Sequence, residues 1–364
     1  MDRTMPRFVY RTRINSATAR AFTMAALLLL FVGLQLSCGG GSGGGIGTGG
    51  GTGGTTGGTS GSTTGGNVAN ACGENFQDPN CRTLSFGGVT RAYLLHVPTN
   101  FQPNSSALVV GLHGSHGSGL EMSQNTDLNS TADKNGFAVA YPYSLVSPGA
   151  GFTEWNEFFN QSYGSNPPDD VGFIRQVITT LQAELHPDPK RIYVTGLSNG
   201  GFMAHRVGIQ LSDMVAAIGV VEGTVVSPGL IQDVPAPLGP VSVLIVHGDE
   251  DSTVLYCGQP VVASQEETFN YWTGPSANSC SIFDTSAPLC DSQRNITSVL
   301  EKDATGCRGS SEVRFYKLIG GQHLWYNVAM NVPGQTPFNP KFDSTTGVTT
   351  NDILWNFFAS HPKP

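Results

Sequence analysis

The sequence predicts a doubly wound, mostly parallel α/β sheet in a single folded domain, and three observations support this. Short, continuous apolar runs such as 107–112 and 241–246 are typical of strands buried on both faces. Segments with helical apolar spacing alternate with these runs, as at 170–185. At 191–206, a β-favouring run leads directly into a glycine-rich turn and a helix. Strands that alternate with helices form parallel sheets with helices on both faces.

Individual elements follow from apolar periodicity and capping residues. Asp169 and Asp170 cap a helix that runs to about residue 185, in which Val171, Ile174 and Ile178 recur at helical spacing. In chain order we expect strands at 90–97, 107–112, 137–141, 191–194, 215–221, 241–246 and 313–318, and helices at 170–185, 202–206, 265–272 and 350–360.

The N-terminal region carries export signals. Five arginines precede an apolar run at 24–36 that is too short to span a bilayer. Ser37 and Cys38 follow it directly and resemble a bacterial lipobox, although Gln35 stands where Leu is usual. We therefore expect a signal peptide at 1–37 and a lipidated Cys38; ordinary signal cleavage nearby is the alternative.

Low-complexity sequence separates these signals from the rest of the chain. Residues 39–66 are almost wholly Gly, Thr and Ser, a composition that buries little apolar surface and predicts a flexible tether. This gives an anchor and tether at 38–69 and a folded domain at 70–364. We expect an exported protein, either a cell-surface or outer-membrane lipoprotein or a freely secreted one.

Charge excludes one class of partner. The formal net charge is −8, and removal of 1–37 takes away five Arg and one Asp, which lowers it to −12. An acidic chain without a basic stripe argues against nucleic-acid binding. We expect membrane attachment only through the lipid anchor, and a monomer.

The cysteine count favours an oxidising compartment. Seven cysteines are present, and setting Cys38 aside leaves an even six without a C-x-x-C pair, so no zinc or redox motif is indicated. We expect three disulfides, with 15 possible connectivities and Cys72–Cys81 as the first guess. The six are Cys72, Cys81, Cys257, Cys280, Cys290 and Cys307.

Ser198 is the candidate nucleophile. It lies in a Gly-x-Ser-x-Gly pattern between a predicted strand and a predicted helix, the context of a nucleophile elbow. The same pattern occurs at 40–44 in the glycine run, so the five residues alone are weak and the context decides. The alternative is a glycine-rich structural turn.

The other two groups of a catalytic triad should follow in the order acid, then histidine. Of the downstream histidines, His323 follows the last strand in a glycine turn, whereas His361 lies in the terminal tail. Three carboxylates follow the preceding strand. We favour Asp251, because Asp249 is placed to cap the turn and Glu250 to face solvent.

An oxyanion hole needs two backbone N–H groups near the nucleophile. Asn199 supplies the first, and Ser115, in a glycine-rich loop after a buried run, is the candidate for the second. His113 and His116 in the same loop lack a third ligand, so we expect no metal.

Together these segments resemble the family of polyhydroxybutyrate depolymerase-like and feruloyl esterases. The resemblance implies an α/β-hydrolase fold, a triad of Ser198, Asp251 and His323, ester substrates and no cofactor. Trp155 and Trp325 are candidate walls of the acyl site, with a core or rim role as the alternative. The matching segments are 112–114, 154–156, 169–173, 193–201, 247–251 and 320–325.

The function expected is an exported serine carboxylic ester hydrolase. Feruloyl or acetyl esters of plant polysaccharide are the first substrate class, and polyhydroxybutyrate or its oligomers are the alternative. A peptidase or a non-catalytic surface-binding protein on the same fold are the remaining alternatives.

Overall fold

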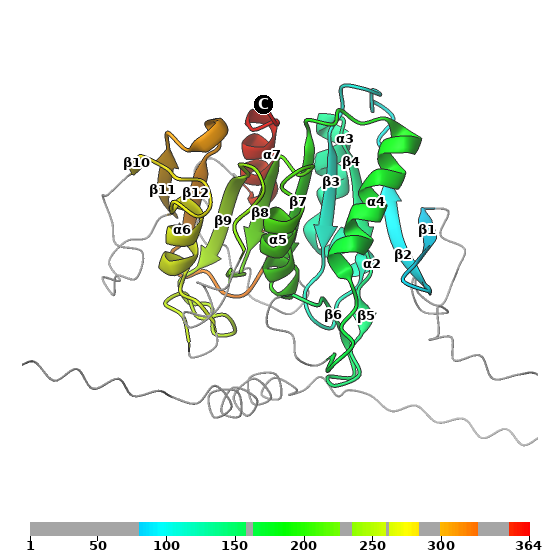
Figure 1. Cartoon of the computed structure of the whole chain (residues 1–364), viewed down its shortest axis with the longest axis horizontal. Helices are drawn as coiled ribbons and strands as arrows, with labels where there is room; N and C mark the ends of the chain where they lie inside the picture. Colours follow the sequence, from blue (N-terminus) through cyan, green and yellow to red (C-terminus); the bar gives the residue numbers. More distant parts are fainter. Residues whose placement is uncertain (1–79, 158–162, 226–234, 260–261, 284–298, 327–348) are drawn as a thin grey trace, which may run out of the picture. The chain divides into compact units, whose positions relative to one another are not determined.

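A computed structural model describes residues 80–157, 163–225, 235–259, 262–283, 299–326 and 349–364 (Figure 1). The expected signal peptide, the lipidation site at Cys38, the tether and the start of the expected domain lie outside these residues. Cys72 and Cys290 also lie outside them, as does Phe158, a third aromatic candidate for the wall of the acyl site. None of the described helices is long and apolar enough to cross a membrane.

The described chain is built on a ten-stranded sheet with a parallel centre and antiparallel edges (Figure 1). Its order is β1-β2-β4-β3-β7-β8-β9-β12-β11-β10. Pairing is parallel from β4 to β12 and antiparallel outside that range. The strands are β1 (Cys81–Phe86), β2 (Val89–His96), β3 (Leu108–Leu112), β4 (Ala138–Pro142), β7 (Ile192–Leu197), β8 (Ala217–Val221), β9 (Ser242–Gly248), β10 (Ile282–Phe283), β11 (Val299–Thr305) and β12 (Val313–Leu318).

Helices cover both faces of the sheet, and alternate strand residues bury against each set. In β3, Val110 packs in the core under α4, α5 and α6, whereas Val109 packs in the core under α2, α3 and α7. Figure 1 shows these two layers of helices in front of and behind the sheet. The helices are α2 (Gly119–Thr126), α3 (Leu128–Asn135), α4 (Asp170–Leu185), α5 (Asn199–Gln210), α6 (Gln265–Thr273) and α7 (Thr350–Ser360).

The predicted α/β-hydrolase architecture is confirmed, because every expected strand and helix is present within a few residues of its predicted bounds. The segments that the sequence did not predict are short or lie at the sheet edges. The helices α2 and α3 have eight residues each and few apolar side chains, and β1 alternates exposed and half-buried residues. A short hairpin of β5 (Leu145–Val146) and β6 (Thr153–Glu154) was also missed, since two-residue strands carry no periodicity.

Candidate active site

Ser198 lies on a strained turn between β7 and α5. Its backbone has φ 57° and ψ −123°, a region that residues with a side chain rarely occupy. The flanking glycines make this turn possible, because a Cβ on Gly196 would lie 2.1 Å from the carbonyl oxygen of Gly200. A Cβ on Gly200 would lie 2.2 Å from the carbonyl oxygen of Leu112. The turn places Ser198 at the N-terminus of α5, where a developing negative charge is stabilised.

Asp251 and His323 form a hydrogen-bonded pair at the carboxyl ends of β9 and β12. The Nδ1–H of His323 donates to Oδ2 of Asp251 over 2.7 Å. The N–H groups of Thr253 and Val254 donate to Oδ1 of Asp251 over 2.7 and 2.9 Å. Burial would raise the pKa of Asp251, but the hydrogen bonds from His247 and His323 outweigh it and hold that pKa well below its ordinary value. Asp251 is therefore an ionised acceptor that fixes the imidazole.

Of the two competing carboxylates, Asp249 bonds to the loop after β12 and not to its own turn, whereas Glu250 faces solvent as expected. Asp249 accepts a hydrogen bond from the N–H of Gly320 (2.6 Å), so it ties the two loops together. Glu250 is exposed to solvent.

A direct backbone contact holds the loop after β9, which carries Asp251, against the loop after β12, which carries His323. The N–H of Glu250 donates to the carbonyl of Gly321 over 2.8 Å. A Cβ on Gly248 would lie 2.3 Å from the carbonyl carbon of Gly321, and a Cβ on Gly321 would lie 2.8 Å from the Cα of Gly248. Both positions need glycine because any side chain would push the loops apart.

Ser198 and the Asp251–His323 pair lie at the carboxyl ends of strands of the same sheet. The strands β7, β8, β9 and β12 are all parallel, so their carboxyl ends lie on the same side of the sheet. Ser198 and His323 are both partly exposed there, and no hydrogen bond links the Ser198 hydroxyl to the imidazole. Catalytic hydrogen bonds of this kind often tighten only when substrate binds.

The loop after β3 passes beside the nucleophile. A Cβ on Gly114 would lie 3.4 Å from the Cβ and 4.0 Å from the Oγ of Ser198. The N–H groups of Ser115 and Asn199 have no hydrogen-bond partner among the described residues. The structure therefore leaves two unpaired donors on the two elements closest to Ser198.

Trp155 braces these two elements instead of lining an open site. Its backbone N–H donates to Oδ1 of Asn199 (2.7 Å), and its indole N–H donates to the carbonyl of His113 (2.9 Å). Its side chain is fully buried. Trp325 is buried as well, and its indole donates to Oδ1 of Asn351 (2.8 Å). Both tryptophans take the packing role that was the alternative to an acyl-site wall.

His113 is a neutral structural group of the same loop. Its Nε2 accepts from the N–H of Ser144 (3.0 Å), so Nδ1 carries the proton and donates to the carbonyl of Gly114 (2.7 Å). Burial lowers its pKa to about 4. Both ring nitrogens are thus used within the protein. His116 is exposed and stacks on Phe152, with ring centroids 3.5 Å apart.

A buried ion pair anchors the segment that contains Trp155. Arg91 donates to Oδ1 of Asp170 over 2.7 Å, and both side chains are almost completely buried. The other oxygen, Oδ2, accepts from the N–H of Asn156 (2.8 Å), and the guanidinium lies 3.9 Å from the ring centroid of Phe173. The segment at 154–156 is therefore fixed to the start of α4.

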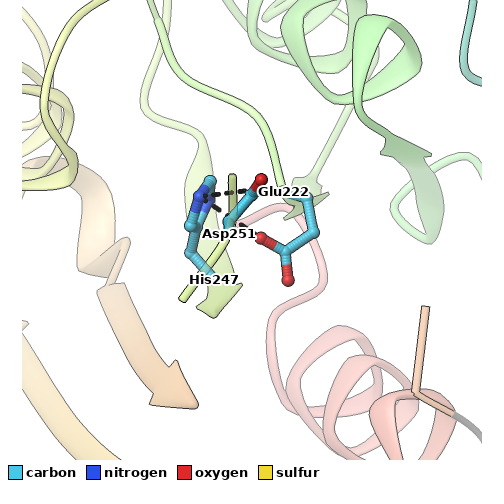
Figure 2. Close-up of side chains that lie close together, drawn as sticks. All are labelled: Glu222, His247 and Asp251. Atoms are coloured by element: carbon cyan, nitrogen blue, oxygen red, sulfur yellow. Dashed lines mark ion pairs between the residues drawn. The ribbon is translucent and has the colours of Figure 1, made fainter. Parts of the chain in front are cut away.

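Two buried residues next to Asp251 were not identified as site residues from the sequence. Glu222 directly follows β8, and His247 lies near the end of β9 (Figure 2). His247 Nε2 lies 3.2 Å from a carboxyl oxygen of Glu222 and 3.2 Å from Oδ2 of Asp251. The sequence signal that could have identified Glu222 is its place directly after a predicted apolar strand, the next strand along the chain after the one that leads to Ser198.

The arrangement of these three side chains does not suit a metal ion, although they offer ligand atoms within 4.8 Å of one another. His247 Nε2 lies 2.8 Å from the carbonyl oxygen of Val254, which accepts only from an N–H. That nitrogen therefore carries a proton and has no lone pair for a cation.

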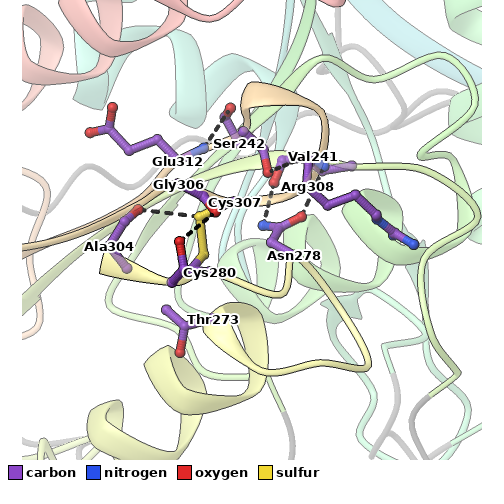
Figure 3. Close-up of a disulfide and its surroundings, with 12 residues drawn as sticks. Val241, Ser242, Thr273, Asn278, Cys280, Ala304, Gly306, Cys307, Arg308 and Glu312 are labelled. Carbon is purple, nitrogen blue, oxygen red and sulfur yellow. Dashed lines mark hydrogen bonds between the residues drawn. A yellow bond between two sulfur atoms is a disulfide. The ribbon is translucent and has the colours of Figure 1, made fainter. Parts of the chain in front are cut away.

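The described cysteines form part of the expected disulfide set. Cys280 and Cys307 are bonded and join the end of the α6 region to the turn before β12 (Figure 3). Asn278 supports the same junction through hydrogen bonds with the backbones of Val241 and Arg308. Cys81 is disulfide-bonded too.

The expectation that Cys257 is paired is wrong in this structure. Its thiol is free and exposed on the loop after β9. Each of the other described cysteines is already in a disulfide, so none remains as a partner for it.

Comparison with known proteins shows that part of this chain is similar to esterases. Residues 91–231 match the family model described as esterase PHB depolymerase. The relative "Putative esterase NocK" of Nocardia uniformis subsp. tsuyamanensis is 34% identical over 175 residues, which cover 47% of this chain and 48% of the relative. Feruloyl esterase B of Piromyces equi is 26% identical over 241 residues, which cover 64% of this chain and 42% of the relative. The chain thus spans less than half the length of these two relatives.

Solved structures agree on the fold. An acetyl xylan esterase from Aspergillus awamori matches with a TM-score of 0.50 and 16% identity, covering 77% of this chain and 98% of that one. The structure named pOPH matches with a TM-score of 0.52 and 17% identity, covering 78% and 87%. The similarity to the esterase PHB depolymerase family model is confined to residues 91–231, which include Ser198 but neither Asp251 nor His323.

Proposed function

We propose that this protein is an exported serine carboxylic ester hydrolase that uses Ser198, His323 and Asp251. The observation that carries the proposal is the joint geometry at one sheet edge. A strained serine at a helix N-terminus and a histidine bonded to a buried aspartate over 2.7 Å lie at the carboxyl ends of parallel strands of the same sheet. The esterase family domain supports the reaction class.

The reaction proceeds in two halves. The Ser198 hydroxyl attacks the ester carbonyl while Nε2 of His323 takes its proton, and Asp251 stabilises the resulting imidazolium. The carbonyl oxygen becomes an oxyanion that accepts hydrogen bonds from the N–H groups of Ser115 and Asn199. The alcohol leaves with the proton from His323, and an acyl-enzyme remains. Water, deprotonated by His323, then releases the acid and restores Ser198.

We favour feruloyl or acetyl esters of plant polysaccharide as substrates, because the relatives include a feruloyl esterase and an acetylxylan esterase of Aspergillus ficuum. A second candidate is a polyhydroxyalkanoate or its oligomers. The family description and a similarity to poly(3-hydroxyalkanoate) depolymerase C of Paucimonas lemoignei, 27% identical over 206 residues, support it.

Hydrolysis of p-nitrophenyl acetate by the purified protein tests the reaction class. Ser198→Ala should lose roughly 10³-fold or more in kcat. Ser115→Ala is the matched control, since the proposed donor at 115 is the backbone N–H, and it should keep nearly full activity. Turnover of peptide anilides without ester turnover would favour the peptidase alternative. Binding of substrate without any turnover would favour the non-catalytic alternative.

A substrate panel then separates the two candidate classes. Methyl ferulate and acetylated xylan represent the first class, and a hydroxybutyrate trimer and a polymer film represent the second. The proposal expects higher kcat/KM on the first pair, and the reverse order would assign the enzyme to polyester oligomers.

Export and anchoring have a separate test. Cys38→Ser should release the protein from the membrane fraction if Cys38 carries lipid, whereas ordinary signal cleavage leaves the distribution of wild type and variant the same.

A further inference from the structure

Glu222 places a second carboxyl oxygen within 4.8 Å of an oxygen of Asp251, and Figure 2 shows the two side chains next to each other. It follows β8 with a backbone φ of 51°, and its side chain is fully buried. Its backbone N–H donates to the carbonyl of Val246 (3.0 Å), which fixes the residue between β8 and β9. The N–H of Gly248 lies 3.1 Å from each of its carboxyl oxygens. Among the described residues, this is the single backbone donor to that carboxyl group.

His247 contributes no positive charge that would balance this carboxyl group. Its Nδ1 accepts from the side-chain amide of Gln265 (2.8 Å), which also donates to the carbonyl of Gly223 (3.1 Å). Its Nε2–H donates to the carbonyl of Val254 (2.8 Å). One ring nitrogen accepts and the other donates, so the imidazole is the neutral Nε2–H tautomer. Because the Nε2–H of His247 already donates to the carbonyl of Val254, it does not fully satisfy the carboxyl group of either Glu222 or Asp251.

When two carboxyl groups are buried together and no permanently charged cation among the described residues lies beside them, only one of the two ionises. The other keeps its proton, because two negative charges in one low-dielectric site repel each other strongly. Asp251 receives hydrogen bonds from Thr253, Val254 and His323, whereas Glu222 receives only that of Gly248. The negative charge is therefore more stable on Asp251. Burial, and then the charge of Asp251, raise the pKa of Glu222 well above its ordinary value.

The remaining titratable groups around the cluster do not change this balance. Tyr326, three residues after His323, is held neutral because burial raises its pKa. Its hydroxyl donates to the carbonyl of Gln322 (2.8 Å). Lys317 on β12 directs its ammonium to Asp249 at 3.6 Å. His323 is the only group facing the pair that gains a proton during the proposed reaction.

We propose that Glu222 is a protonated carboxylic acid at neutral pH which donates a hydrogen bond to Asp251 and acts as a positioning residue for the Asp251–His323 pair. The catalytic consequence rests on the proposed function. A neutral donor disperses the charge of Asp251 and holds its carboxylate in place, so it lowers the basicity of His323. An ionised Glu222 would have the opposite effect, because a second negative charge near the imidazole would raise its basicity.

The sign of that effect makes the proposal testable through pH profiles of kcat/KM on p-nitrophenyl acetate. Glu222→Gln retains a neutral donor and should leave the acid limb in place with kcat close to wild type. Glu222→Leu removes the donor, so the acid limb should move to higher pH and kcat/KM should fall on the order of 10²-fold. Glu250→Gln, an exposed acid on the same loop, is the control and should shift neither value.

A readout that does not depend on turnover separates this inference from the proposed function. The infrared spectrum of the Ser198→Ala protein at neutral pH should contain the C=O stretch of a buried carboxylic acid. That band should be absent from the spectrum of the double variant that also carries Glu222→Gln, so it should appear in the difference between the two spectra. If the wild type shows no esterase activity but the band is present, the proposed function fails and the protonation of Glu222 stands.

Three results would overturn the inference. They are the absence of a band that depends on Glu222, an acid limb that moves to lower pH in Glu222→Gln, and a stoichiometric metal ion that is lost on the same substitution. A folded Glu222→Leu protein with an unchanged acid limb would equally remove the positioning role.

Discussion

Two buried charge clusters among the described residues, Arg91–Asp170 and Glu222–His247–Asp251, are balanced in different ways. In the first, Asp170 pairs with the guanidinium of Arg91, a full cation, and accepts one further backbone hydrogen bond. In the second, the imidazole of His247 lies between Asp251 and Glu222, and His323 is the group that would become cationic in the proposed reaction. The side chain of His323 is 21% exposed, whereas both members of the first pair are at most 1% exposed.

The difference shows where proton chemistry is available. Burial raises the pKa of Asp170, but the permanent charge of Arg91 and the N–H of Asn156 oppose that rise and stabilise the carboxylate, so the Arg91–Asp170 pair serves to hold residues 154–156 in place. The second cluster has more carboxyl groups than fixed cations and opens to solvent through His323. A substitution in the Arg91–Asp170 pair should therefore affect the free energy of unfolding. A substitution in the cluster around Asp251 should affect the rate of ester hydrolysis and the pH dependence of that rate.

The largest expected effect comes from Asp251→Asn. The amide leaves the shape of the site unchanged but removes the charge that fixes the imidazole tautomer, so kcat should fall by about 10⁴-fold. Stopped assays with p-nitrophenyl acetate measure the rate, and thermal unfolding checks that the variant is folded. A loss of less than tenfold in a folded variant would mean that another group supports His323.

Arg91→Leu should instead act on stability. It leaves Asp170 buried without its cation, which costs about 3–5 kcal/mol in the free energy of unfolding. Urea denaturation measures this loss, and kcat per folded molecule should change little. Arg175→Leu is the matched control, because the Arg175–Asp213 pair is exposed and should cost less than about 1 kcal/mol. Equal losses in both variants would contradict the distinction between buried and exposed pairs.

Glu222→Gln should change how stability depends on pH. Because the pKa of Glu222 is raised in the folded state, folding takes up a proton at any pH between its unfolded and folded pKa values. Wild-type stability therefore falls as pH rises through this window, by about 1.4 kcal/mol per pH unit, and the amide variant lacks this loss. Urea titrations at a series of pH values above the ordinary pKa of a glutamate should show the variant gaining on the wild type as pH increases. Parallel curves would contradict a proton on Glu222.

The smallest expected effect is that of Glu250→Gln. This carboxylate is next to Asp251 in sequence but exposed, so its removal should change the free energy of unfolding by less than about 0.5 kcal/mol. A large effect on rate would show that proximity in sequence, and not burial, determines which acid matters.

The sequence was sufficient for the parts of the fold whose pattern is local. Strands such as β3 and β9 are buried on both faces and leave continuous apolar runs, and α4 carries both a cap and helical spacing. Asp251 and His323 could be selected because chain order and strand ends restricted the choice.

The remaining features depend on contacts that no local pattern records. Glu222 matters because β8 lies between the strands that carry Ser198 and Asp251, which is a property of strand order. Trp155 would look the same in the sequence whether it lined a pocket or, as found, braced the loop from beneath. Cys257 counted toward an even set of cysteines, but spacing does not reveal which thiol is left over.

The contact between Gly248 and Gly321 has a consequence for protein engineering. Since the two main chains are in contact there, the position of the segment that carries Asp251 depends on the position of the segment that carries His323. Grafting either segment alone from a related hydrolase would misalign the partner left behind, so a productive chimera has to exchange both together. Libraries built on this scaffold can vary the surrounding rim freely as long as those two glycines are retained.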